Sequence, residues 1–143
     1  MLRASAILLT LWTGLSVVLS VGNLFWLLAL RHNAPALIVL FRDTQGSGIE
    51  SRALATINAL AVVCNAAIAA VSMLSLVTIW SAFVRGAAWA FWSLTFCLSF
   101  LQVFRWVSDT IFYHEKLLTN VASSLPLIAG IILGAIGLIR KPS

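Results

Sequence analysis

The sequence predicts an all-α fold, an integral membrane four-helix bundle that forms a single domain over residues 1–143. Composition is the first reason, because 62% of the residues are hydrophobic and 9% are charged, whereas soluble domains carry about 25% charged residues. The second reason is length, since a helix needs about 20 apolar residues to cross a hydrocarbon core of roughly 30 Å. Four stretches approach that length, at about 6–30, 53–80, 87–108 and 117–139.

The first stretch lies between Arg3 and Arg31 and stands where a secretory signal peptide would stand. Its uncharged run from Ala4 to Leu30 is longer than the about 7–15 apolar residues of a signal peptide, and no clear A-x-A site follows it. We therefore expect a retained membrane span.

The segment between the first two spans is predicted to hold a short interfacial helix at about 34–42. Asn33 and Pro35 are typical of an N-cap followed by a proline in the first helical turn. The apolar run 36–41 is too short to cross a membrane and too apolar for water. A helix lying at the membrane surface satisfies both conditions.

Arg85 separates the second span from the third, and the fourth span contains Pro126. Proline removes a backbone donor and disfavours helix in the residue before it. A helix that starts near Ser124 would be only about 22 Å long, too short for a span. We therefore favour a kinked helix that starts near Leu117.

Four spans place both termini on one side of the membrane, called side A, and the 31–52 segment on the other, side B. All four acidic residues fall on side B, whereas the short side-A segments carry only positive charge. This asymmetry predicts a multi-pass protein with cytoplasmic termini. Aromatic belts are expected from Trp12, Trp80, Trp89 and Trp92 toward side A, and from Trp26, Trp106 and Tyr113 toward side B.

Small and polar residues recur at helical spacing on every span. Membrane helices associate through such residues, because lipid removes most of the hydrophobic drive. The fourth span carries a GxxxG pattern, which serves either the chain's own packing, the interpretation we favour, or a partner subunit. The candidate helix-packing residues are Asn65, Ser72, Gly130, Gly134 and Gly137.

Polar residues from three spans fall at similar depth near side B. Ionisable groups at membrane depth are costly and indicate a functional site. One interpretation is a polar pocket that holds a lipid headgroup, a sterol hydroxyl or another amphiphile. The other, which we favour, pairs Arg105 with Asp109 near the headgroups and leaves the amides to tie helices together. The candidate ligand-binding residues are Asn23, Arg52, Asn58, Gln102, Arg105 and Asp109.

Catalytic patterns are missing from the sequence. His32 and His114 lie outside the spans, and the chain holds no GxSxG, HExxH or phosphate-binding glycine loop. Cys64 and Cys97 are not in a metal-binding spacing and are interpreted as buried packing residues. We predict no catalytic residue, no metal and no cofactor, with a bound lipid left open. The net charge of +5 is carried near helix ends, which argues against nucleic acid.

The arrangement resembles small four-helix bacterial membrane proteins of uncharacterised families. The residues that carry the likeness are Asn33-Ala34-Pro35, Glu50-x-Arg52 and Val84-Arg85-Gly86. Its layout is also similar to that of the ergosterol-biosynthesis scaffold proteins of the endoplasmic reticulum. This resemblance implies a four-helix tether without catalytic residues. Neither likeness assigns a site residue.

The sequence favours a non-catalytic membrane subunit or scaffold that packs against larger membrane partners or forms a homo-oligomer. This hypothesis depends on the missing catalytic constellation and on the small-residue face of every span. The alternative is a protein or enzyme that binds a lipid or amphiphile through the side-B polar residues. A small transporter is third, because no ionisable group lies near the midplane, where coupling sites occur.

Overall fold

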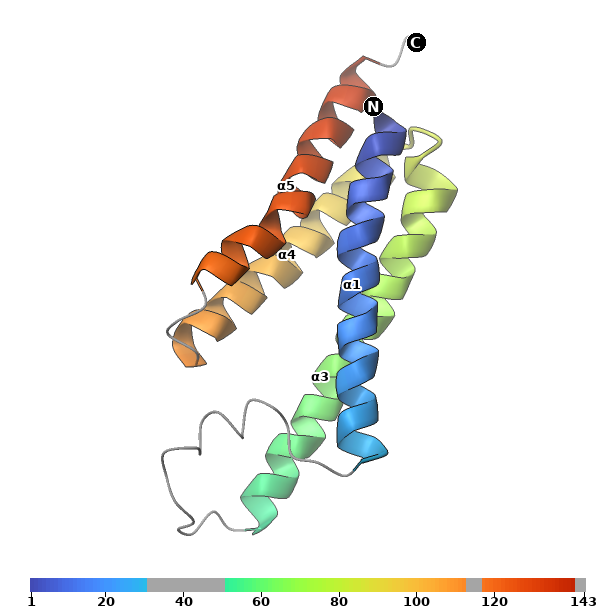
Figure 1. Cartoon of the computed structure of the whole chain (residues 1–143). Helices are drawn as coiled ribbons and strands as arrows, with labels where there is room; N and C mark the ends of the chain where they lie inside the picture. The colour runs from blue at the N-terminus through green and yellow to red at the C-terminus, as the bar shows by residue number, and fades with distance from the viewer. Residues whose placement is uncertain (31–50, 113–116, 141–143) are drawn as a thin grey trace. The chain divides into compact units, whose positions relative to one another are not determined.

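The structure, a computed structural model, describes the backbone of residues 1–30, 51–112 and 117–140, and the side chains of 1–30, 55–107 and 121–140. Within these ranges it holds four α-helices (Figure 1). All four are long and apolar enough to cross a membrane. They are α1 (Leu2–Leu28), α3 (Ser51–Thr78), α4 (Ala88–Phe112) and α5 (Leu117–Ile139).

The predicted all-α class and the four apolar helices are confirmed. Helix α1 begins at Leu2, earlier than expected, since nothing in its first residues breaks a helix and Arg3 can extend toward the surface. Helix α5 begins at Leu117 with Pro126 inside it, as predicted. The expected interfacial segment at 34–42 lies outside the described residues.

The chain divides into two compact units, and each is described by itself. The terminal unit comprises Met1–Leu15 and Ser72–Ser143, and the middle unit comprises Ser16–Val71. The expected single domain over 1–143 stays a prediction.

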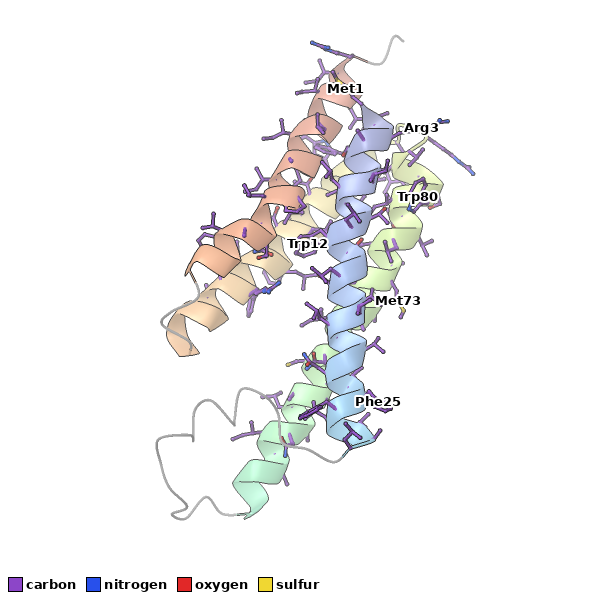
Figure 2. The ribbon with its side chains drawn as sticks, in the orientation of Figure 1. Met1, Arg3, Trp12, Phe25, Met73 and Trp80 are labelled. Atoms are coloured by element: carbon purple, nitrogen blue, oxygen red, sulfur yellow. The ribbon has the colours of Figure 1, made fainter. Side chains whose placement is uncertain are left out.

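The core of the terminal unit is built from apolar side chains of α1, α4, α5 and the end of the second span. Phe83, Leu9, Ile79 and Leu98 are the largest apolar side chains that are fully buried. The rings of Phe83 and Phe91 stack with centroids 6.1 Å apart. Trp12, labelled in Figure 2, is also buried in this core.

A π-helix, η1 (Ile79–Phe83), continues α3 directly. The Val84 N–H donates to the Ile79 carbonyl at 3.0 Å, a bond across five residues that widens the turn. Ile79 and Phe83, the first and last residues of this π-helix, are both buried. Gly86 then takes a φ of 81°, a left-handed conformation that favours glycine, and the chain turns into α4.

Glycines let α5 approach its neighbours closely within the terminal unit. A Cβ at Gly130 would lie 2.8 Å from a methyl carbon of Leu9, and one at Gly134 would lie 2.9 Å from the Phe91 ring. The Ser5 hydroxyl donates to the Gly130 carbonyl at 2.6 Å, buried between α1 and α5. Small residues therefore allow this helix pair to form a backbone-level contact.

The middle unit is joined by an interhelical amide pair. Asn23 Nδ2 donates to Asn65 Oδ1 at 3.2 Å, and Asn65 Nδ2 donates to the Ala61 carbonyl at 2.8 Å. Leu27 is buried against Ala61 and Val62 on the same face. Within this unit, one polar contact and one apolar contact thus join α1 to α3.

The prediction that both cysteines are buried packing residues is wrong. Cys64 and Cys97 are free thiols on exposed helix faces. On α4 the buried stripe includes the neighbours Leu94 and Leu98, and Cys97 stands outside it. Periodicity of small residues did not show which face of each helix is buried.

Candidate functional site

The predicted side-B residues are spread over both units. Asn23 and Asn58 belong to the middle unit, and Gln102 and Arg105 belong to the terminal unit, where Gln102 is buried and Arg105 is half-buried. Helices α3 and α4 contain Arg52 and Asp109, whose side chains lie outside the described set. Two of these residues form hydrogen bonds with residues that are not among the candidate ligand-binding residues. Asn23 bonds to Asn65, and Gln102 bonds to Ser124.

The five predicted packing residues all lie at helix contacts or in buried positions. Asn65 bonds to Asn23 in the middle unit. Ser72 is fully buried, and its hydroxyl has no hydrogen-bond partner in the part of the chain described. Gly130, Gly134 and Gly137 face α1 residues, among them Leu9, Ser5 and Leu2.

A groove of about 580 Å³ lies between α4 and α5 in the terminal unit. Its walls are two stripes of residues spaced three and four apart, one on each helix, which is the spacing of a single helix face. Most of the lining is apolar. The lining residues are Ser99, Gln102, Val103, Trp106 and Val107 on α4, and Ser124, Leu127, Ile128 and Ile131 on α5.

Three polar side chains meet at one point of this groove. Gln102 Nε2 donates to Ser124 Oγ at 2.6 Å, and Trp106 Nε1 donates to the same oxygen at 3.0 Å. Gln102 and Trp106 are one turn apart on α4, so both can reach one hydroxyl on α5. The Gln102 side chain is 94% buried, since its exposed fraction is 6%.

The carboxamide oxygen of Gln102 has no hydrogen-bond partner in the described part of the chain. Leaving a buried acceptor unsatisfied costs about 1–3 kcal/mol. Buried polar atoms are nearly always paired, so this unpaired oxygen in a residue that lines a groove calls for an explanation. The groove therefore combines an apolar wall with one lining residue, Gln102, whose buried acceptor has no partner among the described residues.

The sequence indicates Gln102 as a candidate residue, but it does not indicate Ser124 as its partner or Trp106 as the second donor to Ser124. From the sequence, Trp106 is expected only in an aromatic belt, and Ser124 only as an alternative helix start. The available signal was the one-turn spacing of Gln102 and Trp106 together with a small polar residue on the fourth span. Which residue of α5 faces them depends on helix packing.

A second hollow, of about 430 Å³, lies where α1 begins and α5 ends. It is lined by Met1, Leu2, Arg3, Gly137 and Arg140, and both arginines are exposed. Trp80 lies in the same unit and donates its indole N–H to Thr10 Oγ1 at 3.0 Å (Figure 2). Exposed arginines and a half-exposed indole are typical of headgroup depth.

The residues whose side chains are described contain no group of three His, Cys, Asp or Glu able to hold a metal ion. Comparison with protein-family models, with curated proteins and with solved structures finds no match to this chain. The resemblances drawn from the sequence therefore stay predictions, and function is argued from geometry.

Proposed function

We propose that this chain is a multi-pass membrane protein that binds an amphiphile in the groove between α4 and α5. The observation that carries the proposal is the Gln102 oxygen, which has no hydrogen-bond partner among the described residues. Gln102 is 94% buried and lines an apolar groove. Ligand sites are mostly apolar and hold a small number of placed polar groups. The volume of about 580 Å³ falls within the range of about 300–1,000 Å³ found for such sites.

The position of the groove along the helices supports a membrane ligand. All its α4 residues fall within Ala88–Val107 and all its α5 residues within Val121–Ile139, the two segments apolar enough to span a membrane. A groove at that depth opens to lipid and not to water. Its ligands would therefore enter from the bilayer, where amphiphiles are concentrated.

The subunit or scaffold hypothesis stays a prediction. It depends partly on small-residue faces that could receive a partner helix. On α5 the described glycines lie against Leu9, Phe91 and Leu2 of the same chain. That face is used internally, so it does not favour a partner over a ligand.

A groove-filling substitution tests the proposal. In Ile128→Trp the indole would enter the groove, whereas Ile132→Trp places the same ring one turn away, at a position that does not line it. Ile128 and Ile132 are 51% and 54% exposed, so the two changes are matched in burial. Purified protein in phosphatidylcholine vesicles is irradiated with hexadecanol that carries a diazirine and an alkyne, and labelled peptides are mapped by mass spectrometry.

We expect saturable labelling of peptides from 99–131, competed by unlabelled hexadecanol. Ile128→Trp should lower it about tenfold, equivalent to about 1.4 kcal/mol, while Ile132→Trp should leave it unchanged. Labelling spread evenly over all four helices, or equal labelling of both variants, would contradict the proposal.

A further inference from the structure

We infer that the groove between α4 and α5 selects a neutral lipid that carries a hydroxyl group. This inference rests on the proposed function and names the chemical class of its ligand. It follows from how donors and acceptors are distributed among Gln102, Trp106 and Ser124.

Two nitrogen atoms at this point donate to one oxygen. Gln102 Nε2 and Trp106 Nε1 donate to Ser124 Oγ, at 2.6 Å and 3.0 Å. Within the described residues the Gln102 oxygen remains as an acceptor without a donor. A ligand that completes this site must therefore supply a donor.

Charged donors and charged acceptors are both unsuited to this position. A carboxylate or phosphate would present acceptors to an acceptor, and no arginine or lysine among the described residues lines the groove to neutralise it. An ammonium would place an unpaired cation among apolar side chains, which costs far more than a neutral group. A hydroxyl supplies one donor at the smallest desolvation cost.

A hydroxyl also satisfies the site in both orientations of the carboxamide. The 2.6 Å separation between Gln102 and Ser124 suits an O–H···O bond, with the Gln102 oxygen turned toward Ser124, as well as a short N–H···O bond. The outward end of the amide would then be an NH₂ group, and a hydroxyl accepts from it as readily as it donates to an oxygen. A hydroxyl fits both orientations, whereas an ether fits only the one with the NH₂ group outward, so the comparison of alcohol with ether decides between them.

Three photoactivatable ligands of one chain length test this selectivity: hexadecanol, its methyl ether and palmitate. With the wild-type protein in phosphatidylcholine vesicles, we expect saturable labelling of 99–131 to favour the alcohol over the ether about three- to tenfold, the effect of one ordinary hydrogen bond. Palmitate should label less than the alcohol by at least the same factor. In Gln102→Met, which keeps the side-chain length, the alcohol and the ether should label equally.

The control variant is Ser93→Ala, which changes an exposed polar residue of the same helix outside the groove lining and should keep the preference for the alcohol. Equal labelling by alcohol and ether in the wild-type protein would overturn the inference. That outcome leaves the proposed function standing if Ile128→Trp still blocks both ligands. The comparison of alcohol with ether in the wild-type protein tests the inference even if the Gln102→Met variant does not insert into the membrane.

A helix from a second chain in the groove would also overturn the inference. It would exclude all three ligands, and a photoactivatable residue at Val103 would then yield a cross-linked species of higher mass. Val103 is a lining residue that is 59% exposed, so a neighbouring helix seated there would be within reach.

Discussion

Close approach at single residues holds the terminal unit together. At Gly134 an added Cβ would lie 2.9 Å from the Phe91 ring, 3.0 Å from the Ser5 hydroxyl and 3.1 Å from the Phe83 ring. Phe83 and Phe91 are buried and stacked, so neither ring has room to move. The Ser5 hydroxyl is also engaged, since it donates to the Gly130 carbonyl.

Gly134→Ala should therefore destabilise the protein by about 1–3 kcal/mol, the usual cost of overpacking. The measurement is unfolding in mixed micelles, followed by circular dichroism as the SDS fraction rises. Gly14→Ala is the matched control, because nothing described lies within 4 Å of an added Cβ there. Alanine is also the better helix former, so the control should be neutral or stabilising. Equal destabilisation by the two changes would show that the α1–α5 contact is looser than described.

At the scale of elements, the turn between η1 and α4 depends on one backbone conformation. Gly86 has a φ of 81° and its N–H donates to the Phe83 carbonyl at 2.8 Å. The π-helix before it brings Ile79 and Phe83 into the core. The turn therefore positions two buried side chains of one span and the first residues of the next.

Gly86→Ala should cost about 1–2 kcal/mol, because a left-handed conformation brings the Cβ close to the carbonyl oxygen. Gly86→Asn should cost less, since asparagine tolerates this region better. Thermal unfolding in detergent, with the two variants compared side by side, measures the difference. If alanine and asparagine prove equally harmless, the left-handed turn is not needed for the native packing.

At the scale of the whole molecule, the outward surface of the spans is apolar. Between 17% and 33% of the residues in the most apolar window of each span are buried, so most side chains face outward. Among the exposed ones are Phe96 at 73%, Val18 at 67% and Leu74 at 67%. Large apolar surfaces of this kind are unstable in water and are expected against lipid.

The native cysteines report on this environment. Cys64 and Cys97 are exposed on helices that are apolar enough to span a membrane. In intact membrane vesicles, a membrane-impermeant maleimide should modify neither thiol, because both would face hydrocarbon. After solubilisation in SDS both should react, which a mass shift on gels would show. Rapid modification of either cysteine in intact vesicles would contradict the proposed membrane placement.

The four helices were predictable because the requirement that makes them is local. Each span needs enough consecutive apolar residues to cross a bilayer, and that can be counted along the chain. The beginning of α5 at Leu117, ahead of Pro126, follows from the same count, since a later start leaves too few residues. Gln102 was also recognisable as a polar residue within a span.

The sequence did not allow us to predict which residues form hydrogen bonds between helices. Ser124 lies 22 residues from Gln102, and Ser5 lies 125 residues from Gly130, so neither bond belongs to a local pattern. Which faces meet depends on how side chains of different helices pack, and small changes in helix rotation exchange one partner for another. The sequence by itself determined four apolar helices, because solvent acts on each segment separately. Only the tertiary structure decided that Gln102 bonds to Ser124 and leaves its oxygen at an apolar groove, because that result requires two helix faces to be placed against each other.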